Sequence, residues 1–87
     1  MKNRIHPGEF LREELSERGV TQTQLAHHIG ASPGVVNLIC NGRRGISPEM
    51  AKKLAAALGT TPELWMNLQT SYDLNLAEQP EFGLLEA

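Results

Sequence analysis

Apolar residues recur every three or four positions in five segments of the chain, and no segment alternates convincingly between apolar and polar residues. This spacing places the apolar side chains on one face of a helix, which the fold then buries. The predicted inner faces consist of Phe10, Leu11 and Leu15; Leu25, Ala26 and Ile29; Val36 and Ile39; Ala51, Leu54, Ala55 and Leu58; and Trp65. The pattern therefore predicts an all-α fold of about five helices.

Residues that start and stop helices mark the limits of these five segments. A serine or threonine side chain caps a helix start, proline fits the first helical position, and glycine adopts the left-handed conformation that ends a helix. The predicted helices begin at Pro7, Thr21, Ser32, Ser47 and Thr61 and end near Arg18, Gly30, Asn41, Gly59 and Glu78. We therefore expect a single domain over residues 1–78 and a short C-terminal tail over 79–87.

The segment 21–44 has the clearest functional pattern. Thr21 and Gln24 match a capping box, Gly30 ends the first helix, and Ser32-Pro33 starts the next one after a short turn. Two helices joined in this way form a helix-turn-helix, whose second helix enters the major groove of DNA. The second and third helices are therefore predicted to form a DNA-binding unit.

The distribution of charge qualifies this prediction. The net charge of the 87 residues is −2, whereas nucleic-acid-binding surfaces are usually basic. Basic and acidic side chains balance over residues 1–20, residues 21–59 sum to +3, and residues 60–87 sum to −5. The basic centre coincides with the helix-turn-helix, and the acidic C-terminal third fits either a basic partner or a role in solubility.

Cysteine content and hydropathy indicate the cellular compartment. The single cysteine, Cys40, excludes an internal disulfide and fits a reducing environment. No apolar segment approaches the roughly 20 residues that a membrane span requires, and the N-terminal residues lack the apolar core of a signal peptide. We therefore expect a cytoplasmic protein that does not associate with a membrane.

Motifs along most of the chain resemble a known family. The pattern TQ-x-x-LA-x-x-x-G-x-S-x-x-x-V-x-x-I-x-x-G is similar to the helix-turn-helix of the lambdoid-repressor (XRE) family. The flanking motifs His6-Pro7-Gly8-Glu9, Ile46 to Ala51, Thr61 to Trp65, Asn67 to Gln69 and Tyr72 to Leu74 resemble those of the HigA-type antitoxins. The resemblance implies an antitoxin that neutralises a RelE-like (HigB-type) ribonuclease toxin and represses its own operon as a dimer.

Ten residues are candidates for contact with double-stranded operator DNA. Gln22 begins the second helix, where its amide and the helix dipole favour a phosphate, and the matching glutamine of the superfamily has this role. Asn41, Arg43 and Arg44 follow the third helix and are expected to contact phosphates. The exposed face of the third helix presents Ser32, Pro33, Gly34, Val35, Asn37 and Leu38 to the bases. Exposed side chains in ordinary solvated turns remain the alternative for the phosphate contacts.

Within this face, Asn37 is the residue that we most expect to contact a base. Direct recognition works best with side chains that offer paired hydrogen bonds, and only Ser32 and Asn37 can hydrogen-bond here through their side chains. Val35 and Leu38 offer only apolar contact with thymine methyl groups. DNA shape and two cooperating half-sites are therefore expected to contribute to specificity.

The fifth helix carries a second apolar surface. Trp65, Leu68, Tyr72 and Leu76 form one stripe at helical spacing. Core packing explains Trp65, but little of so small a domain remains to cover the end of the stripe. Tyr72, Leu74 and Leu76 are therefore candidates for a homodimer interface.

No pattern predicts an enzyme, a metal site or a cofactor. His27 and His28 are adjacent, so they cannot bind one metal from the same helical face, and the spacing to Cys40 matches no zinc motif. Glu13 and Glu14 diverge on a helix and do not make a catalytic pair. Two alternatives to the operator-binding antitoxin remain open: a protein-interaction antitoxin with weak DNA binding, and an unrelated XRE-type regulator.

Overall fold

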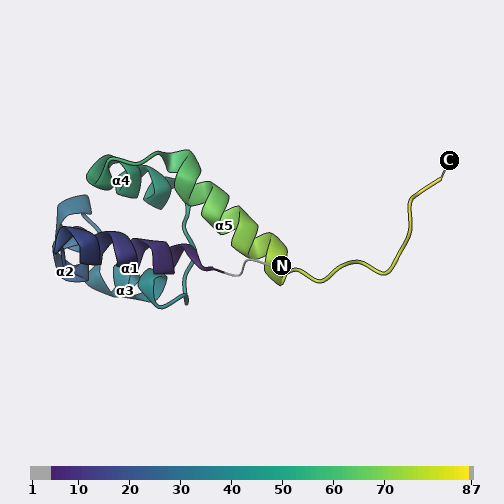
Figure 1. Ribbon diagram of the computed structural model, residues 1–87, viewed down its shortest axis with the longest axis horizontal. Helices are drawn as coiled ribbons and strands as arrows, with labels where there is room; N and C mark the ends of the chain where they lie inside the picture. Colours follow the sequence, from purple (N-terminus) through teal and green to yellow (C-terminus); the bar gives the residue numbers. More distant parts are fainter. Residues whose placement is uncertain (1–4, 87) are drawn as a thin grey trace.

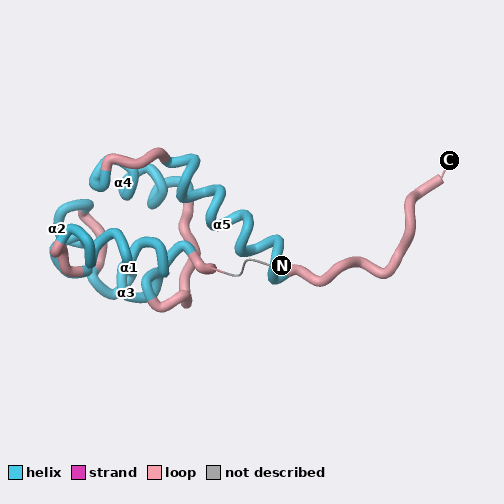
Figure 2. The backbone as a smooth tube through the Cα atoms, viewed as in Figure 1, coloured by secondary structure: helices cyan, strands magenta, loops and turns pink. Residues whose placement is uncertain are grey.

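The computed structural model describes residues 5–86, which form five helices and no strand (Figures 1 and 2). The helices are α1 (Pro7–Arg18), α2 (Gln22–Ile29), α3 (Pro33–Cys40), α4 (Pro48–Leu58) and α5 (Pro62–Leu76). The predicted all-α fold is confirmed, and α2 and α3 form the expected helix-turn-helix. None of these helices is long and apolar enough to cross a membrane.

Local capping explains why the helices begin where they do. Thr21 and Gln24 form both bonds of the capping box, since Thr21 Oγ1 accepts the Gln24 N–H at 3.0 Å and Gln24 Oε1 accepts the Thr21 N–H at 2.9 Å. Ser32, Ser47 and Thr61 cap α3, α4 and α5, and each precedes a proline. These contacts lie within four residues of one another, so the sequence alone could predict them.

The hydrophobic core is centred on Trp65 of α5. Its side chain is fully buried, its Nε1 donates to Thr60 Oγ1 at 2.8 Å, and the Phe10 ring meets it edge-on with 5.3 Å between ring centroids. The other fully or nearly fully buried apolar residues are Leu11, Leu15, Leu25, Ala26, Val36, Ile39, Cys40, Ile46, Ala51, Leu54, Ala55 and Leu58. All five helices contribute to this core, which fixes the orientation of α3 relative to the others.

The start of α1 packs directly on the end of α3. His6 caps α1 through Nδ1, which accepts the Gly8 N–H at 2.9 Å, and the His6 ring is buried. A Cβ atom added at Gly8 would overlap the carbonyl oxygen of Ile39 and lie 2.8 Å from its carbonyl carbon. Glycine is therefore needed at this position because two backbones meet there.

The end of α5 differs from the prediction, because the helix stops at Leu76 instead of Glu78. Ala77 is extended, with φ −68° and ψ 138°, and Pro80 lies three residues beyond. Leu74 and Leu76 are exposed, so no tertiary packing holds a further turn, and an unsupported terminal turn is not stable alone. Residues 77–86 leave the helical body as an extended tail (Figure 1).

Burial of His6 makes the stability of the domain depend on pH. Desolvation lowers the pKa of His6 below its ordinary value of 6.5, although the carboxylates of Asp73 and Glu9 oppose the shift. The unfolded chain therefore takes up this proton at a higher pH than the folded chain does. The stability contributed by neutral His6 is complete above about pH 6.5 and declines as the pH falls below it. We therefore expect unfolding to need less urea at about pH 5.5 than at about pH 7.5, so that the urea midpoint is lower at the lower pH.

A His6→Asn variant is the matched control for this prediction. Asparagine keeps a side-chain acceptor for the cap of α1 but does not titrate. The urea midpoint of the variant is expected to change less over the same pH range than that of the unmodified chain. An equal decline in the two proteins would assign the pH dependence to other groups.

Candidate nucleic-acid interface

The exposed face of α3 holds most of the residues that the sequence assigned to base contact. Ser32, Pro33, Gly34, Asn37 and Leu38 are exposed, and Leu38 retains 40% of its accessible surface. Ser32 Oγ accepts the Gly34 N–H at 3.1 Å, so the hydroxyl proton remains available to donate. The face therefore presents few hydrogen-bonding groups beside apolar surface.

Val35 is the least exposed of the residues that were predicted to contact bases. It is half-buried and packs against the core, whereas its neighbour Val36 is almost fully buried. A residue in this position contributes part of its apolar surface to the outer face of α3. Its access to a thymine methyl group is smaller than that of Leu38.

Three side-chain amides, of half-buried Gln22 and of exposed Asn37 and Asn41, form a hydrogen-bonded chain across α2 and α3. Asn37 Nδ2 donates to Gln22 Oε1 at 3.1 Å, and Asn41 Nδ2 donates to Asn37 Oδ1 at 3.1 Å. Each group of Asn37 keeps one further hydrogen-bonding position, because an amide nitrogen has two protons and an amide oxygen has two lone pairs. The amide chain (Gln22, Asn37 and Asn41) therefore fixes the orientation of Asn37 without using its whole capacity.

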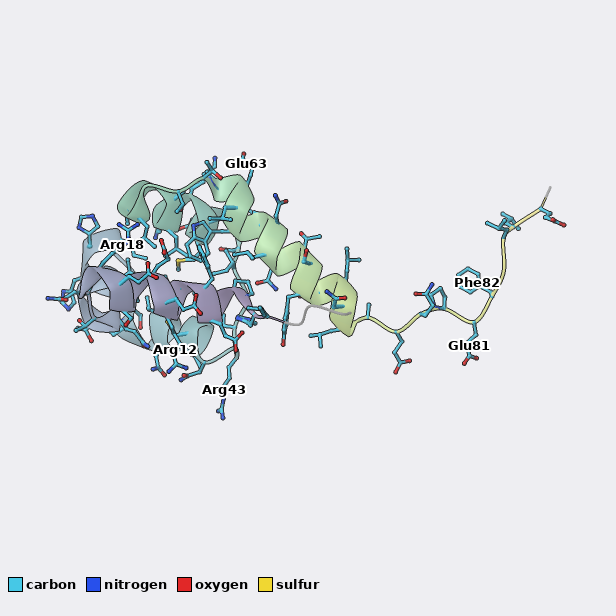
Figure 3. The ribbon with its side chains drawn as sticks, viewed as in Figure 1. Arg12, Arg18, Arg43, Glu63, Glu81 and Phe82 are labelled. Atoms are coloured by element: carbon cyan, nitrogen blue, oxygen red, sulfur yellow. The ribbon has the colours of Figure 1, made fainter. Side chains whose placement is uncertain are left out.

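The α3–α4 loop (residues 41–47) begins with a tight turn that directs two arginines away from the body. Gly42 has φ 74°, its N–H donates to Ile39 O at 3.0 Å, and the Arg43 N–H donates to Leu38 O at 2.9 Å. These two bonds are those of a Schellman motif. Arg43 and Arg44 are exposed, and Arg43 points into solvent in Figure 3. Among residues 5–86 neither arginine forms an ion pair.

The outer part of α5 is exposed as the sequence pattern suggested, although one of its three residues has an internal contact. The Tyr72 ring meets the His6 ring edge-on, with 4.8 Å between centroids, and is half-buried. Leu74 is 70% exposed and Leu76 is 50% exposed. In the tail, Phe82, Leu84 and Leu85 are also exposed, and Figure 3 shows Phe82 on the tail, at a distance from the helices.

The histidines and the cysteine that sequence analysis set aside as metal ligands differ in their exposure. His27 and His28 are exposed on α2, whereas Cys40 is buried, and burial raises the pKa of its thiol. Within residues 5–86 there is no group of three histidine, cysteine or acidic residues that could hold a metal ion.

Sequence analysis missed one residue that contacts the α3–α4 loop. Gln69 of α5 accepts the Ile46 N–H through Oε1 at 2.7 Å and donates to Asp73 Oδ1 through Nε2 at 2.9 Å. The second bond joins residues four apart on one helix and is visible in the sequence as a common helical pair. The first joins residues 23 apart, and no local pattern indicates it.

Comparison with known proteins agrees with this architecture. A family model described as helix-turn-helix matches residues 11–65, which is more than half of the chain. The antitoxin HigA-1 of Vibrio cholerae is 44% identical over 71 residues, which cover 80% of this chain and 67% of that protein.

Two solved structures combine the same fold with DNA. The Pseudomonas aeruginosa antitoxin HigA with the higBA promoter is 41% identical, with a TM-score of 0.82 over 85% of this chain and 82% of that one. The antitoxin GraA in complex with its operator is 43% identical, with a TM-score of 0.86 over 98% of this chain and 94% of that one. The chain therefore belongs to the helix-turn-helix family and, within it, to the HigA-type antitoxins.

Proposed function

We propose that this protein is an operator-binding antitoxin, which represses its own operon as a dimer and neutralises a RelE-like ribonuclease toxin by forming a complex with it. The likeness to GraA bound to its operator, over nearly the whole chain, is the observation that carries the DNA-binding part. Because the DNA that it would bind lies in the cell interior, we assign the protein to the cytoplasm. The proposed activity is binding alone, without catalysis, metal or cofactor.

The proposed DNA contacts divide into backbone and base contacts. Phosphate contacts would come from Gln22 at the start of α2 and from Asn41, Arg43 and Arg44 just beyond α3. The base contacts would come from Ser32, Pro33, Gly34, Val35, Asn37 and Leu38. The amide chain supports a role for Asn37, because a side chain already oriented loses less entropy on binding.

We further propose that two copies pair through the end of α5. Tyr72, Leu74 and Leu76 lie on the exposed part of this helix, and large apolar side chains in that position favour association. Residues 1–78 would form the pairing and DNA-binding domain, and residues 79–87 the tail. A dimeric mass in sedimentation equilibrium at micromolar protein supports this assignment, and a monomeric mass contradicts it.

Operator binding is tested with the protein's own promoter. We expect salt-sensitive binding to an inverted repeat whose half-site centres lie about 10 base pairs apart, or a multiple of that distance. A promoter with one half-site scrambled is the control, and it is expected to bind more weakly. Absence of binding at low salt, with and without toxin, would contradict the repressor function.

Toxin neutralisation needs a separate test. The product of the adjacent gene is expected to co-purify with this protein, and its ribonuclease activity is expected to disappear in the complex. Binding to the toxin without binding to the promoter would leave a protein-interaction antitoxin. Binding to the promoter without any effect on the toxin would indicate an XRE-type regulator of another kind.

A further inference from the structure

We propose that Gln69 is a positioning residue for DNA binding: its side chain holds the α3–α4 loop in the shape that directs Arg43 and Arg44 toward the DNA backbone. This inference rests on the DNA binding proposed above. Gln69 itself would not touch DNA, because its side chain is half-buried and faces the loop from α5.

The contact between Gln69 and the loop is specific in its geometry. Its Oε1 accepts the Ile46 N–H at 2.7 Å, and its Nε2 is held by Asp73 Oδ1 at 2.9 Å, which fixes the orientation of the amide. Ile46 is buried, so this backbone N–H has little access to water and needs a partner in the protein. The side chain of Gln69 supplies that partner from a different helix.

The backbone at Gly45 fits closely against the same amide. A Cβ atom added at Gly45 would lie 3.0 Å from Gln69 Oε1 and 3.2 Å from Cδ and Nε2. That spacing is tighter than ordinary van der Waals contact, so glycine lets the loop approach the Gln69 amide. The loop and the amide therefore have complementary surfaces as well as a hydrogen bond.

The other end of the loop is held by its own turn. The Gly42 N–H donates to Ile39 O at 3.0 Å and the Arg43 N–H donates to Leu38 O at 2.9 Å, which ties this end to α3. The backbone that carries both arginines is thus held at Gly42 and Arg43 by the turn and at Ile46 by Gln69.

Holding the loop affects DNA affinity because ordering a flexible segment on binding costs free energy. With Gln69 in place, this cost is met when the domain folds and not when DNA binds. Because α5 also carries the proposed pairing surface, the same helix would set the shape of the loop and the spacing of the two copies on the operator.

The test replaces Gln69 by methionine, which has a similar length but no hydrogen-bond acceptor for the Ile46 N–H. We expect the Gln69→Met variant to bind the operator about tenfold more weakly at a fixed salt concentration. Asn67→Ala is the matched control, since Asn67 is an exposed polar residue of the same helix, and it is expected to keep full affinity.

Two further measurements separate positioning from a general loss of stability. Exchange of the Ile46 amide proton is expected to accelerate in Gln69→Met, while amides of the core helix α4 keep their protection. In a chain that already carries Arg43→Ala and Arg44→Ala, Gln69→Met is expected to change the affinity less than about twofold, because the groups that it positions are gone.

The outcomes distinguish this inference from the function on which it rests. Full affinity in Gln69→Met, or the same tenfold loss with and without the two arginines, would overturn it. If the unmodified chain does not bind its promoter, DNA binding fails as a function. In that case unchanged exchange at Ile46 in Gln69→Met would still show that Gln69 does not hold the loop.

Discussion

A Gly8→Ala variant is expected to be about 3 kcal/mol less stable than the unmodified chain, with a melting temperature about 12–24 °C lower. The added methyl group would overlap the Ile39 carbonyl, which belongs to the backbone of α3 and cannot rotate away. The domain must separate α1 from α3 to admit it. Such a loss is large for a domain of this size, whose total stability is expected near the lower end of about 5–15 kcal/mol.

Gly34 supplies the matched control, because its local environment repeats that of Gly8. Each glycine is the second residue of its helix, follows a proline, and donates its N–H to the capping side chain, at 2.9 Å for Gly8 and 3.1 Å for Gly34. A Cβ atom at Gly34 would meet only Ser32 Oγ, at 3.4 Å.

The two changes are therefore expected to have opposite signs, because the overlap with Ile39 outweighs helix propensity at Gly8, whereas helix propensity decides at Gly34. Alanine is favoured over glycine in a helix by up to about 1 kcal/mol, so Gly34→Ala is expected to keep or raise the melting temperature. Thermal unfolding followed by circular dichroism measures both variants. Equal melting temperatures for Gly8→Ala and Gly34→Ala would mean that the contact between α1 and Ile39 adapts without cost.

The difference between Gly8 and Gly34 shows which features can be predicted from the sequence and which cannot. Capping side chains, the proline at the first helical position and the apolar period act within about four residues, so they can be recognised in the sequence. The limits of the first four helices and the helix-turn-helix were predicted on that basis and are confirmed. The contact of Gly8 with Ile39 joins positions 31 apart, and no local pattern contains it.

The candidate interface also combines features that can be predicted from the sequence with features that cannot. The exposure of Asn37, Leu38, Arg43 and Arg44 follows from helical period and from the turn at Gly42, so their positions were predictable. Their roles in DNA binding remain predictions. The hydrogen bond from Asn37 to Gln22 was not predictable, because it depends on how α2 and α3 pack.

At the end of α5, the local signals predicted a longer helix than the structure has. The sequence offered no stop signal before Pro80, so the helix was extended to Glu78. Helix stability in so short a segment depends on packing, and the structure provides none for the last turn. The same lack of cover leaves Leu74 and Leu76 available for the proposed pairing of two copies.

Removing both arginines of the α3–α4 loop is expected to have the largest effect on DNA binding. The Arg43→Ala/Arg44→Ala variant would lose four phosphate contacts per dimer. At about 1 kcal/mol for each exposed contact, its operator affinity is expected to fall by about 1000-fold at physiological salt. Both side chains are exposed and lack ion-pair partners within residues 5–86, so their removal should leave the melting temperature nearly unchanged.

The salt dependence of binding identifies the mechanism of this loss. Each phosphate contact releases about 0.9 counterion, so the slope of log K against log salt concentration should become shallower by between about 3 and 4. Fluorescence anisotropy with a labelled operator, repeated at several salt concentrations, measures this slope. Lys52→Ala is the control, because it removes an exposed basic side chain from α4, outside the proposed interface, and should keep the slope.

Comparing the affinity for the operator with the affinity for unrelated DNA discriminates between two roles of the arginines. If they contact phosphates, the variant loses affinity on the operator and on unrelated DNA alike, because phosphates carry no sequence information. If they instead contact bases, the loss is confined to the operator and the ratio of specific to non-specific affinity falls. An unchanged slope together with unchanged affinity would remove the α3–α4 loop from the interface, and DNA binding would then depend on α2 and α3 alone.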